Sequence, residues 1–151
     1  MKIRVMTIED YEKVYALWLS TEGMGLNHKD DSKEGVSKFL LRNPDTCFVA
    51  EDEGDAKRII GVIMAGNDGK RAYIYHMSVQ KEERGKGVGS ALLEKCTETL
   101  KAKDIHKVAL LVFATNEKGN AFWEKRGFIK RDDVNYRNKT LIEIPKFAAL
   151  R

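Results

Sequence analysis

The sequence predicts a mixed α+β fold: one central, mostly antiparallel twisted sheet that contains a single parallel β-α-β crossover. Three observations predict it. Strand patterns fill much of the first 80 residues, the strongest helical pattern follows at 88–103, and a wholly apolar strand pattern at 107–113 comes directly after that helix. The expected element order is βααβββαβαββ. A chain of 151 residues can bury a core of its own, so we expect one domain over residues 1–151.

The first half of the chain is expected to form a strand, two helices and three antiparallel strands. Lys2–Met6 has the pattern of a short strand, and Thr7 with Asp10 three residues later is typical of a helix start. A second helix is expected over about Ser32–Leu41, because Asn43-Pro44 stops it. The three strands are expected at 47–51, 58–66 and 72–79, joined by short turns rich in Asp and Gly.

The second half is expected to alternate helices and strands. The helix over Val88–Lys103 carries apolar residues at 88, 92, 96 and 100 along one face. Asn116 can cap a further helix, for which Gly127 is the expected left-handed terminator. Phe128–Arg131 and Thr140–Ile144 are predicted to add two closing strands to the sheet.

Composition and charge argue against several classes of protein. Hydrophobic residues make up 42% and charged residues 33%, which is typical of a soluble globular protein. No apolar run is long enough to span a membrane and no signal peptide is evident, so we expect a cytoplasmic protein. The net charge of +4 would suit nucleic acid, but acidic residues interrupt the basic ones, as in Lys81–Arg84, and a solvated mixed surface fits better.

Neither cysteines nor histidines predict a metal or redox site. Cys47 and Cys96 have no CxxC spacing and lie among apolar residues, so we expect buried free thiols. The histidines are scattered, with no HExxH pattern, at positions 28, 76 and 106. We therefore expect no metal in this protein.

A glycine-rich turn is the strongest functional signal. Arg84-Gly85-Lys86-Gly87-Val88-Gly89-Ser90 lies between the strand that ends at Val79 and the strongest helix. Glycines let the backbone approach a ligand closely, and a helix N-terminus supplies unpaired N–H groups with about half a positive charge. Neither a Walker A loop nor a dinucleotide fingerprint fits in any register. Taken alone, the turn is equally compatible with an anion site and with a tight structural connection.

Two motifs together resemble the GNAT superfamily of N-acetyltransferases. Arg84-x-x-Gly87-x-Gly89 matches the family's Gln/Arg-x-x-Gly-x-Gly/Ala signature, and Asn116 followed by the AFWEKRGF segment at 121–128 is similar to its second signature. The resemblance covers nearly the whole chain. It implies that acetyl-CoA is the donor and that a primary amine of a small molecule or a polypeptide is the acceptor.

The resemblance also implies where acetyl-CoA binds. The pyrophosphate would lie on the backbone amides of the turn, and the pantetheine arm would lie along the preceding strand, where that strand parts from the next. Asn116 is equally compatible with a plain helix cap. The implied cofactor-binding residues are Met77, Ser78, Val79, Arg84, Gly85, Lys86, Gly87, Val88, Gly89, Ser90, Asn116, Asn120, Trp123 and Lys125.

The expected chemistry is direct transfer of the acetyl group to a neutral amine. By resemblance, the backbone N–H of Val79 holds the oxyanion, and such a donor contributes about 2.7 to 4 kcal/mol. Many family members carry a tyrosine acid where this chain has Trp123, and indole cannot protonate a thiolate. A thiol with a pKa of about 8.5 leaves readily without that acid. Trp123 is expected either to line the acyl slot or only to pack in the core.

The acceptor side is expected to carry tyrosines. Alternation along the strand at 72–79 puts Tyr73, Tyr75 and Met77 on one face. Tyr73 and Tyr75 are the catalytic candidates and are expected to order the amine or a water, because a phenol with a pKa near 10 is a poor base. His76 would face the opposite side as a core histidine unless a bulge shifts the register. Tyr136 is a further candidate on a bordering loop.

Two other functions stay open at this point. The replaced tyrosine also fits a non-catalytic acyl-CoA-binding or sensing module, and the turn alone also fits nucleotide phosphate handling. The tail at 147–150 has an apolar pattern that would pack either across the sheet or on a partner subunit, so a homodimer stays open too. No residue pattern selects a particular amine.

Overall fold

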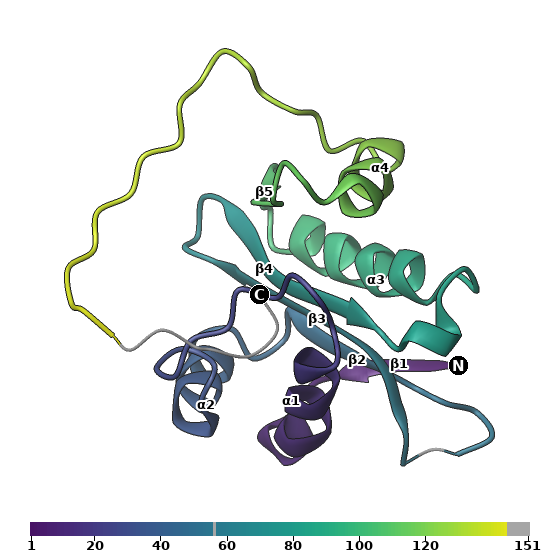
Figure 1. The fold of residues 1–151 in the computed structure, drawn as a ribbon. Coiled ribbons are helices and arrows are strands. Elements are labelled where there is room, and N and C mark those ends of the chain that lie inside the picture. The colour runs from purple at the N-terminus through teal and green to yellow at the C-terminus, as the bar shows by residue number, and fades with distance from the viewer. Residues whose placement is uncertain (56, 145–151) are drawn as a thin grey trace.

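The computed structural model describes residues 1–55 and 57–144 (Figure 1). The tail at 147–150, considered above for a dimer contact, lies outside the described residues. The elements in chain order are β1 (Lys2–Val5), the 3-10 turn η1 (Ile8–Asp10), α1 (Tyr11–Leu19), α2 (Lys33–Arg42), β2 (Cys47–Glu51), β3 (Ile59–Asn67), β4 (Ala72–Val79), the 3-10 turn η2 (Lys81–Glu83), α3 (Val88–Ala102), β5 (Val108–Leu110) and α4 (Glu117–Lys125).

One sheet holds all five strands in the order β1-β2-β3-β4-β5. The first four strands pair antiparallel, and β5 pairs parallel to β4 after the crossover through α3. The predicted α+β fold is therefore confirmed. The parallel pairing is short, because it joins only Ala72–Ile74 to Val108–Leu110. Beyond Ile74, β4 continues without β5 at its side.

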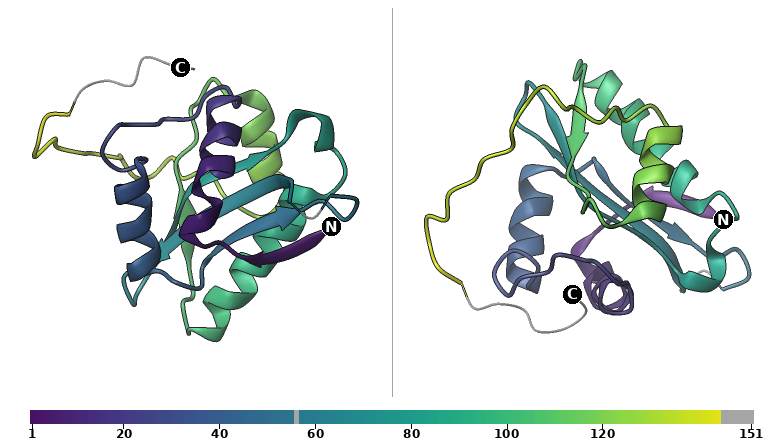
Figure 2. Two further views of the ribbon diagram at one scale, coloured as in Figure 1. Left: turned by 90° about the horizontal axis from the view of Figure 1, so that it is seen from below. Right: turned by 45° about the horizontal axis from the view of Figure 1, so that its top comes forward.

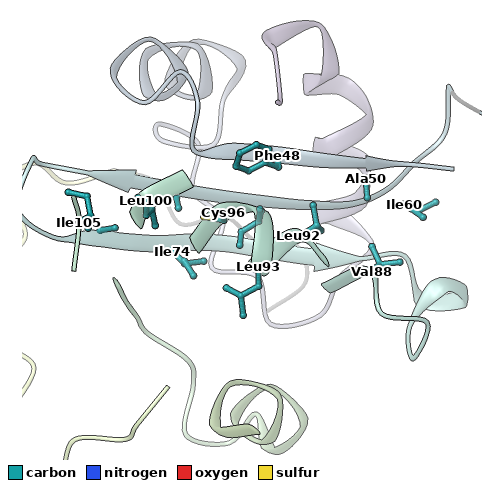
Figure 3. Packing of buried hydrophobic residues seen from close by; sticks show 13 residues of the cluster. Phe48, Ala50, Ile60, Ile74, Val88, Leu92, Leu93, Cys96, Leu100 and Ile105 are labelled. Carbon is teal, nitrogen blue, oxygen red and sulfur yellow. The ribbon is translucent and has the colours of Figure 1, made fainter. Parts of the chain in front are cut away.

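Helices cover both faces of the sheet. Figures 1 and 2 show α1 and α2 on one face and α3 on the other, with α4 beyond α3. β2 is buried over four of its five residues and β3 over eight of its nine, so successive residues enter opposite cores. Figure 3 shows the core on the α3 side, where Leu92, Cys96 and Leu100 lie against the strands.

The two cysteines are free and buried, as predicted. Cys47 belongs to the core under α1 and α2, and Cys96 belongs to the core under α3. Burial raises the pKa of each thiol to about 12. Both side chains therefore act as small apolar groups in the core rather than as nucleophiles.

The prediction of two closing strands is wrong. Residues 128–144 form no strand; they follow α4 as an extended segment that leaves the sheet, drawn yellow-green to yellow in Figure 1. Ile129 is 83% exposed and Leu141 is 86% exposed. An apolar pattern becomes a strand only where a neighbour offers backbone partners, and the free edge beside this segment is the three-residue β5.

A bulge in β4 changes the predicted alternation of its side chains. Ile74 pairs with Ala65 and His76 pairs with Met64, so Tyr75 is the additional residue on β4. The expectations that Met77 shares the face of Tyr73 and Tyr75, and that His76 shares the face of Ile74, are therefore wrong. The alternative, in which a bulge shifts the register, is what the structure contains.

The bulge divides β4 into two parts with opposite alternation. Ile74 lies in the α3-side core, whereas the His76 ring lies 4.8 Å from the Trp18 ring of α1. Met77 and Val79 then pack on the α3 side. As a result, Tyr73, Tyr75 and His76 share the face that α1 and α2 cover.

Asp10 connects β1 to α1. Its carboxylate accepts hydrogen bonds from the Arg4 guanidinium at 2.7 and 2.9 Å and from the Thr7 N–H at 2.9 Å. Burial opposes ionisation of Asp10, but these bonds outweigh it and hold the pKa below its ordinary value. The resulting stability is fully present above an ordinary aspartate pKa of about 3.9 and is lost as pH falls through the lower folded-state pKa.

We therefore expect Asp10→Asn to lower the free energy of unfolding at about pH 7 by roughly 1 to 3 kcal/mol, the range for a hydrogen bond to a charged group. The difference from the wild type should shrink as pH falls below about 4. Urea denaturation across this pH range measures it. Glu12→Gln is the control, because its exposed pair with Lys33 contributes little. An Asp10→Asn effect that is independent of pH would contradict the assignment.

Candidate active site

The glycine-rich turn joins β4, through η2, to the first turn of α3. Gly85 and Gly87 have φ angles of 79° and 84°, in the left-handed region that glycine enters without strain. Gly87 caps α3, and the first helical bond runs from the Ala91 N–H to the Gly87 carbonyl at 3.0 Å. The N–H groups of residues 88–90 precede this bond, so they are donors that the helix itself does not use. With no acidic residue in this first helical turn, the turn favours an anion.

Salt bridges neutralise the carboxylates beside the turn. Arg58 lies 2.6 Å from Glu82 and 3.1 Å from Glu83, and Lys86 lies 3.3 Å from Glu83. The hydrogen bonds from Arg58 and then from Lys86 hold the pKa of Glu83 below its ordinary value. Arg84 donates to the Val79 carbonyl at 3.2 Å and so ties the turn to the end of β4.

Arg126 adds a positive charge that the sequence analysis did not assign to the site. From the end of α4, its Nε donates to Ser90 Oγ at 3.1 Å, and its guanidinium lies 3.6 Å from the centre of the Phe122 ring. Gly89 lets the Phe122 ring, on which Arg126 lies, pack close to α3. A Cβ at position 89 would lie only 3.3 Å from that ring. Arg126 falls within the second motif at a position to which the resemblance gives no role, so no signal in the sequence distinguished it.

The end of β4 presents backbone groups to an open side. The Gln80 N–H donates to the Ile60 carbonyl of β3 at 2.8 Å. Successive residues of a strand direct their backbone groups to opposite sides, so the N–H groups of Val79 and Met77 point away from β3. The ladder with β5 stops at Ile74, and so these N–H groups face the gap between β4 and the next segment.

Ser78 lies apart from this gap. Its backbone groups point toward β3, its side chain is 3% exposed, and its Oγ donates to Met24 Sδ at 3.5 Å on the α1 side. Of the three strand residues implied in cofactor binding, the structure therefore brings Met77 and Val79 to the turn and directs Ser78 elsewhere.

The two asparagines of α4 make hydrogen bonds within their own helix start. Asn116 caps α4 by accepting the Gly119 N–H at 2.9 Å. The Asn120 side-chain amide donates to the carbonyls of Phe113 at 3.0 Å and Asn116 at 2.8 Å. These bonds give both residues a structural role whatever else they bind.

Trp123 packs among aromatic side chains. Its ring meets the rings of Phe122 and Phe128 edge to face, with centroids 5.0 Å apart in each case. It is partly buried against the α3-side core, as expected for packing. Lys125, two residues later, is exposed.

The predicted tyrosines lie on the opposite face of β4, beside α2. The Tyr73 and Tyr75 rings are 4.7 Å apart, and the Phe39 ring lies 5.5 Å from Tyr75. Two cavities of about 650 and 620 Å³ adjoin here and share Tyr75 and Phe39 in their walls. Burial, together with the neighbouring Tyr136 and Tyr75, raises the pKa of Tyr73, which makes it a still poorer base at neutral pH.

His76 lines the second cavity and carries a carboxylate partner. Its Nε2 lies 2.8 Å from Asp31 Oδ1, and Asp31 is 5% exposed. No sequence pattern connects the two residues, because 45 positions separate them and only the bulge turns His76 toward the loop before α2.

Comparison with known proteins now identifies the family. Residues 11–128 match the profile of the acetyltransferase (GNAT) family. The chain belongs to this family. It is 32% identical over 143 residues to an acetyltransferase of Sodalis glossinidius, covering 95% of this chain and 97% of that protein. It is 34% identical over 117 residues to an acetyltransferase of Photorhabdus laumondii, covering 78% of each.

Solved structures agree on the fold of this GNAT enzyme. The PaiA N-acetyltransferase of Thermoplasma acidophilum, solved in complex with coenzyme A, has a TM-score of 0.76 at 22% identity over 87% of this chain and 91% of its own. Ard1 of Thermoplasma volcanium has a TM-score of 0.74 at 22% identity over 85% of this chain and 82% of its own.

The described residues contain neither a metal-binding cluster nor a membrane-spanning helix. Within 1–55 and 57–144, no group of three or more His, Cys, Asp or Glu side chains is arranged to hold a metal ion. In the same part of the chain, no helix is long and apolar enough to cross a membrane.

A substitution of Gly87 tests whether the turn binds the ligand. We expect Gly87→Ala to weaken binding of coenzyme A by about 5- to 30-fold, because a left-handed alanine costs about 1 to 2 kcal/mol and displaces the first N–H groups of α3. Titration calorimetry measures the affinity. Gly69→Ala is the matched control, since Gly69 has a φ of 89° and open space around it, but lies in the turn between β3 and β4. Equal losses in both variants would show that strain alone, and not the turn, weakens binding.

Proposed function

We propose that this GNAT enzyme transfers an acetyl group from acetyl-CoA directly to a primary amine of a small molecule or a polypeptide. One observation supports the proposal most strongly. The anion-binding turn at 84–90 directly follows the part of β4 whose outward N–H groups face a gap. A ligand with a pyrophosphate joined to an amide-bearing arm has both features. Membership of the acetyltransferase (GNAT) family supports the same assignment.

The residues present fit such a donor. The N–H groups of residues 88–90 would hold the pyrophosphate, and Lys86 and Arg126 would add positive charge. The outward backbone groups of Met77 would pair with the amides of the pantetheine arm, as a sheet edge pairs with an added strand, and the Val79 N–H would face the thioester carbonyl. Arg84 would act indirectly, by holding the turn against Val79.

The segment that contains α4 would border the arm from the other side. Asn116, Asn120, Trp123 and Lys125 remain proposed contacts there. The cap made by Asn116 uses its side-chain oxygen, and Asn120 uses its amide nitrogen. The remaining atoms of these two side chains are the ones available to a ligand. Trp123 would contribute an apolar wall.

The acetyl group of the donor is bound as a thioester. The protein must stabilise the oxyanion that forms during transfer and must position the amine. We assign stabilisation of the oxyanion to the backbone N–H of Val79, which points into the gap. No side chain is needed for this role. Tyr73 and Tyr75 would order the amine from the α2 side. Trp123 cannot serve as an acid, so the sulfur would leave as the thiolate, which its pKa of about 8.5 permits.

The direct test incubates the enzyme with acetyl-CoA and a panel of primary amines. Release of free thiol should depend on the amine, and mass spectrometry should find the acetylated product. Gly87→Ala should require more acetyl-CoA for the same rate, whereas Gly69→Ala should not. Tight binding of acetyl-CoA without thiol release above background would overturn the transferase proposal in favour of a binding module.

The tyrosines make a separate prediction. Loss of one neutral hydrogen bond changes binding by about 0.5 to 1.5 kcal/mol, so Tyr75→Phe should raise KM for the amine by about 2- to 12-fold. The KM for acetyl-CoA should stay unchanged in steady-state kinetics. Tyr15→Phe is the control, because Tyr15 packs on Tyr11 in α1 and lines neither cavity. An unchanged amine KM in Tyr75→Phe would remove Tyr75 from the acceptor site.

A further inference from the structure

We propose that His76 is the general base that takes the proton from the acceptor amine, and that Asp31 positions it. The inference rests on the proposed acetyl transfer and adds to it the group that performs the proton transfer. It depends on three features: the face of β4 on which His76 lies, the hydrogen bond to Asp31, and the second ring nitrogen.

The bulge at Tyr75 places His76 on the acceptor face. Regular alternation would put it in the α3-side core with Ile74, but the additional residue turns it toward α1 and α2. There the side chain is 14% exposed, lies against the Trp18 ring and lines the cavity of about 620 Å³. The N–H of the adjacent Met77 lies on the gap side of the strand. The proposed base therefore lies on the part of β4 that borders the gap.

Asp31 is built into the loop before α2 in a way that fixes its carboxylate. Its Oδ2 accepts the Asn27 N–H at 2.8 Å, and its backbone carbonyl accepts the Tyr11 hydroxyl at 2.7 Å. Its Oδ1 faces His76 Nε2. A buried carboxylate needs hydrogen-bond partners. Among the described residues, His76 is the side chain that contacts Asp31 Oδ1.

This hydrogen bond selects the tautomer of His76. A carboxylate only accepts, so the ring hydrogen must lie on Nε2 and the lone pair on Nδ1. Nδ1 has no hydrogen-bond partner among the described residues, and it is not among their fully buried unpaired atoms. The ring therefore offers an unpaired nitrogen that is not fully buried, on a side chain that lines the cavity.

His76 is also the side chain on this face best suited to the task. A neutral imidazole accepts a proton near neutral pH, whereas the two tyrosines are poor bases and the pKa of Tyr73 is raised further. The charged or titratable groups that line the same cavity, besides Asp31 and Tyr75, are His28, Lys29, Asp30, Glu34, Lys38 and Arg42. Of all these groups, Asp31 is the one bonded to the imidazole.

The proposed step balances without a further reactant. His76 Nδ1 takes a proton from the bound ammonium, directly or through one water. The neutral nitrogen then forms a bond to the thioester carbonyl carbon and releases its second proton to solvent. The carbon–sulfur bond breaks, and its electron pair leaves on sulfur. Asp31 stabilises the imidazolium until its proton returns, through solvent, to the thiolate. The products are the amide and the free thiol, with His76 neutral again.

The test compares His76→Gln and Asp31→Asn with the matched controls His106→Gln and Asp104→Asn, which change an exposed histidine and an exposed aspartate that do not line this cavity. At about pH 7, His76→Gln should lower kcat by about 10²- to 10⁴-fold with KM for acetyl-CoA unchanged, and the loss should shrink toward about pH 9.5 as the free amine becomes abundant. Asp31→Asn should lower kcat by about 10-fold or more, and the controls should match the wild type. A His76→Gln loss equal at every pH, or no loss, would overturn the assignment.

A measurement on the wild type keeps the proposal testable even where a variant unfolds. Long-range ¹H–¹⁵N correlations of the folded protein should show His76 as the Nε2–H tautomer, and Asp31→Asn should weaken that preference. The Nδ1–H tautomer in the wild type would overturn the inference, because no lone pair would then face the cavity. If the wild type acetylates no amine, the proposed function and its base fail together; if it acetylates and His76→Gln matches it, only the base fails.

Discussion

The hydrogen bonding of β4 is the constraint on which the rest of the site depends. β3 pairs with β4 along its whole length, whereas β5 pairs with it only as far as Ile74. An unpaired strand edge inside a fold is costly unless water or a ligand satisfies it. The unpaired end of β4 runs straight into the turn at 84–90, where the free N–H groups of α3 begin. One backbone arrangement thus brings an edge of unpaired backbone groups next to a turn of free N–H groups.

In the proposed reaction, the bulge in β4 would separate the donor from the acceptor. Before Tyr75, odd-numbered side chains face α2; after it, even-numbered ones face α1. A single additional residue therefore lets Tyr73, Tyr75 and His76 lie on one face while Met77 and Val79 pack toward α3. Donor and amine would approach β4 from different sides, and the reacting atoms would meet at its edge.

Local features of the site followed from the sequence, and long-range features did not. The left-handed Gly127 after α4, with a φ of 87°, was predicted correctly, because a glycine is the usual left-handed residue after the last turn of a helix. The bulge was not, because it depends on how Met64 and Ala65 pair across the ladder. The strands expected at 128–131 and 140–144 failed for the same reason, since apolar residues such as Ile129 show a strand pattern but β5 offers too short an edge.

Trp123 and the His76–Asp31 pair bear on the two proton transfers of the reaction. One concerns the leaving thiolate, and the other concerns the amine. Trp123 is held by Phe122 and Phe128 and has no proton to give a thiolate, so assistance to the leaving group is absent at that position. A thiolate needs little such help, whereas a protonated amine cannot attack at all. In the proposed mechanism, catalysis would therefore depend on removing a proton from the amine. The structure places a carboxylate-bonded imidazole, that of His76, on the face where that amine would bind.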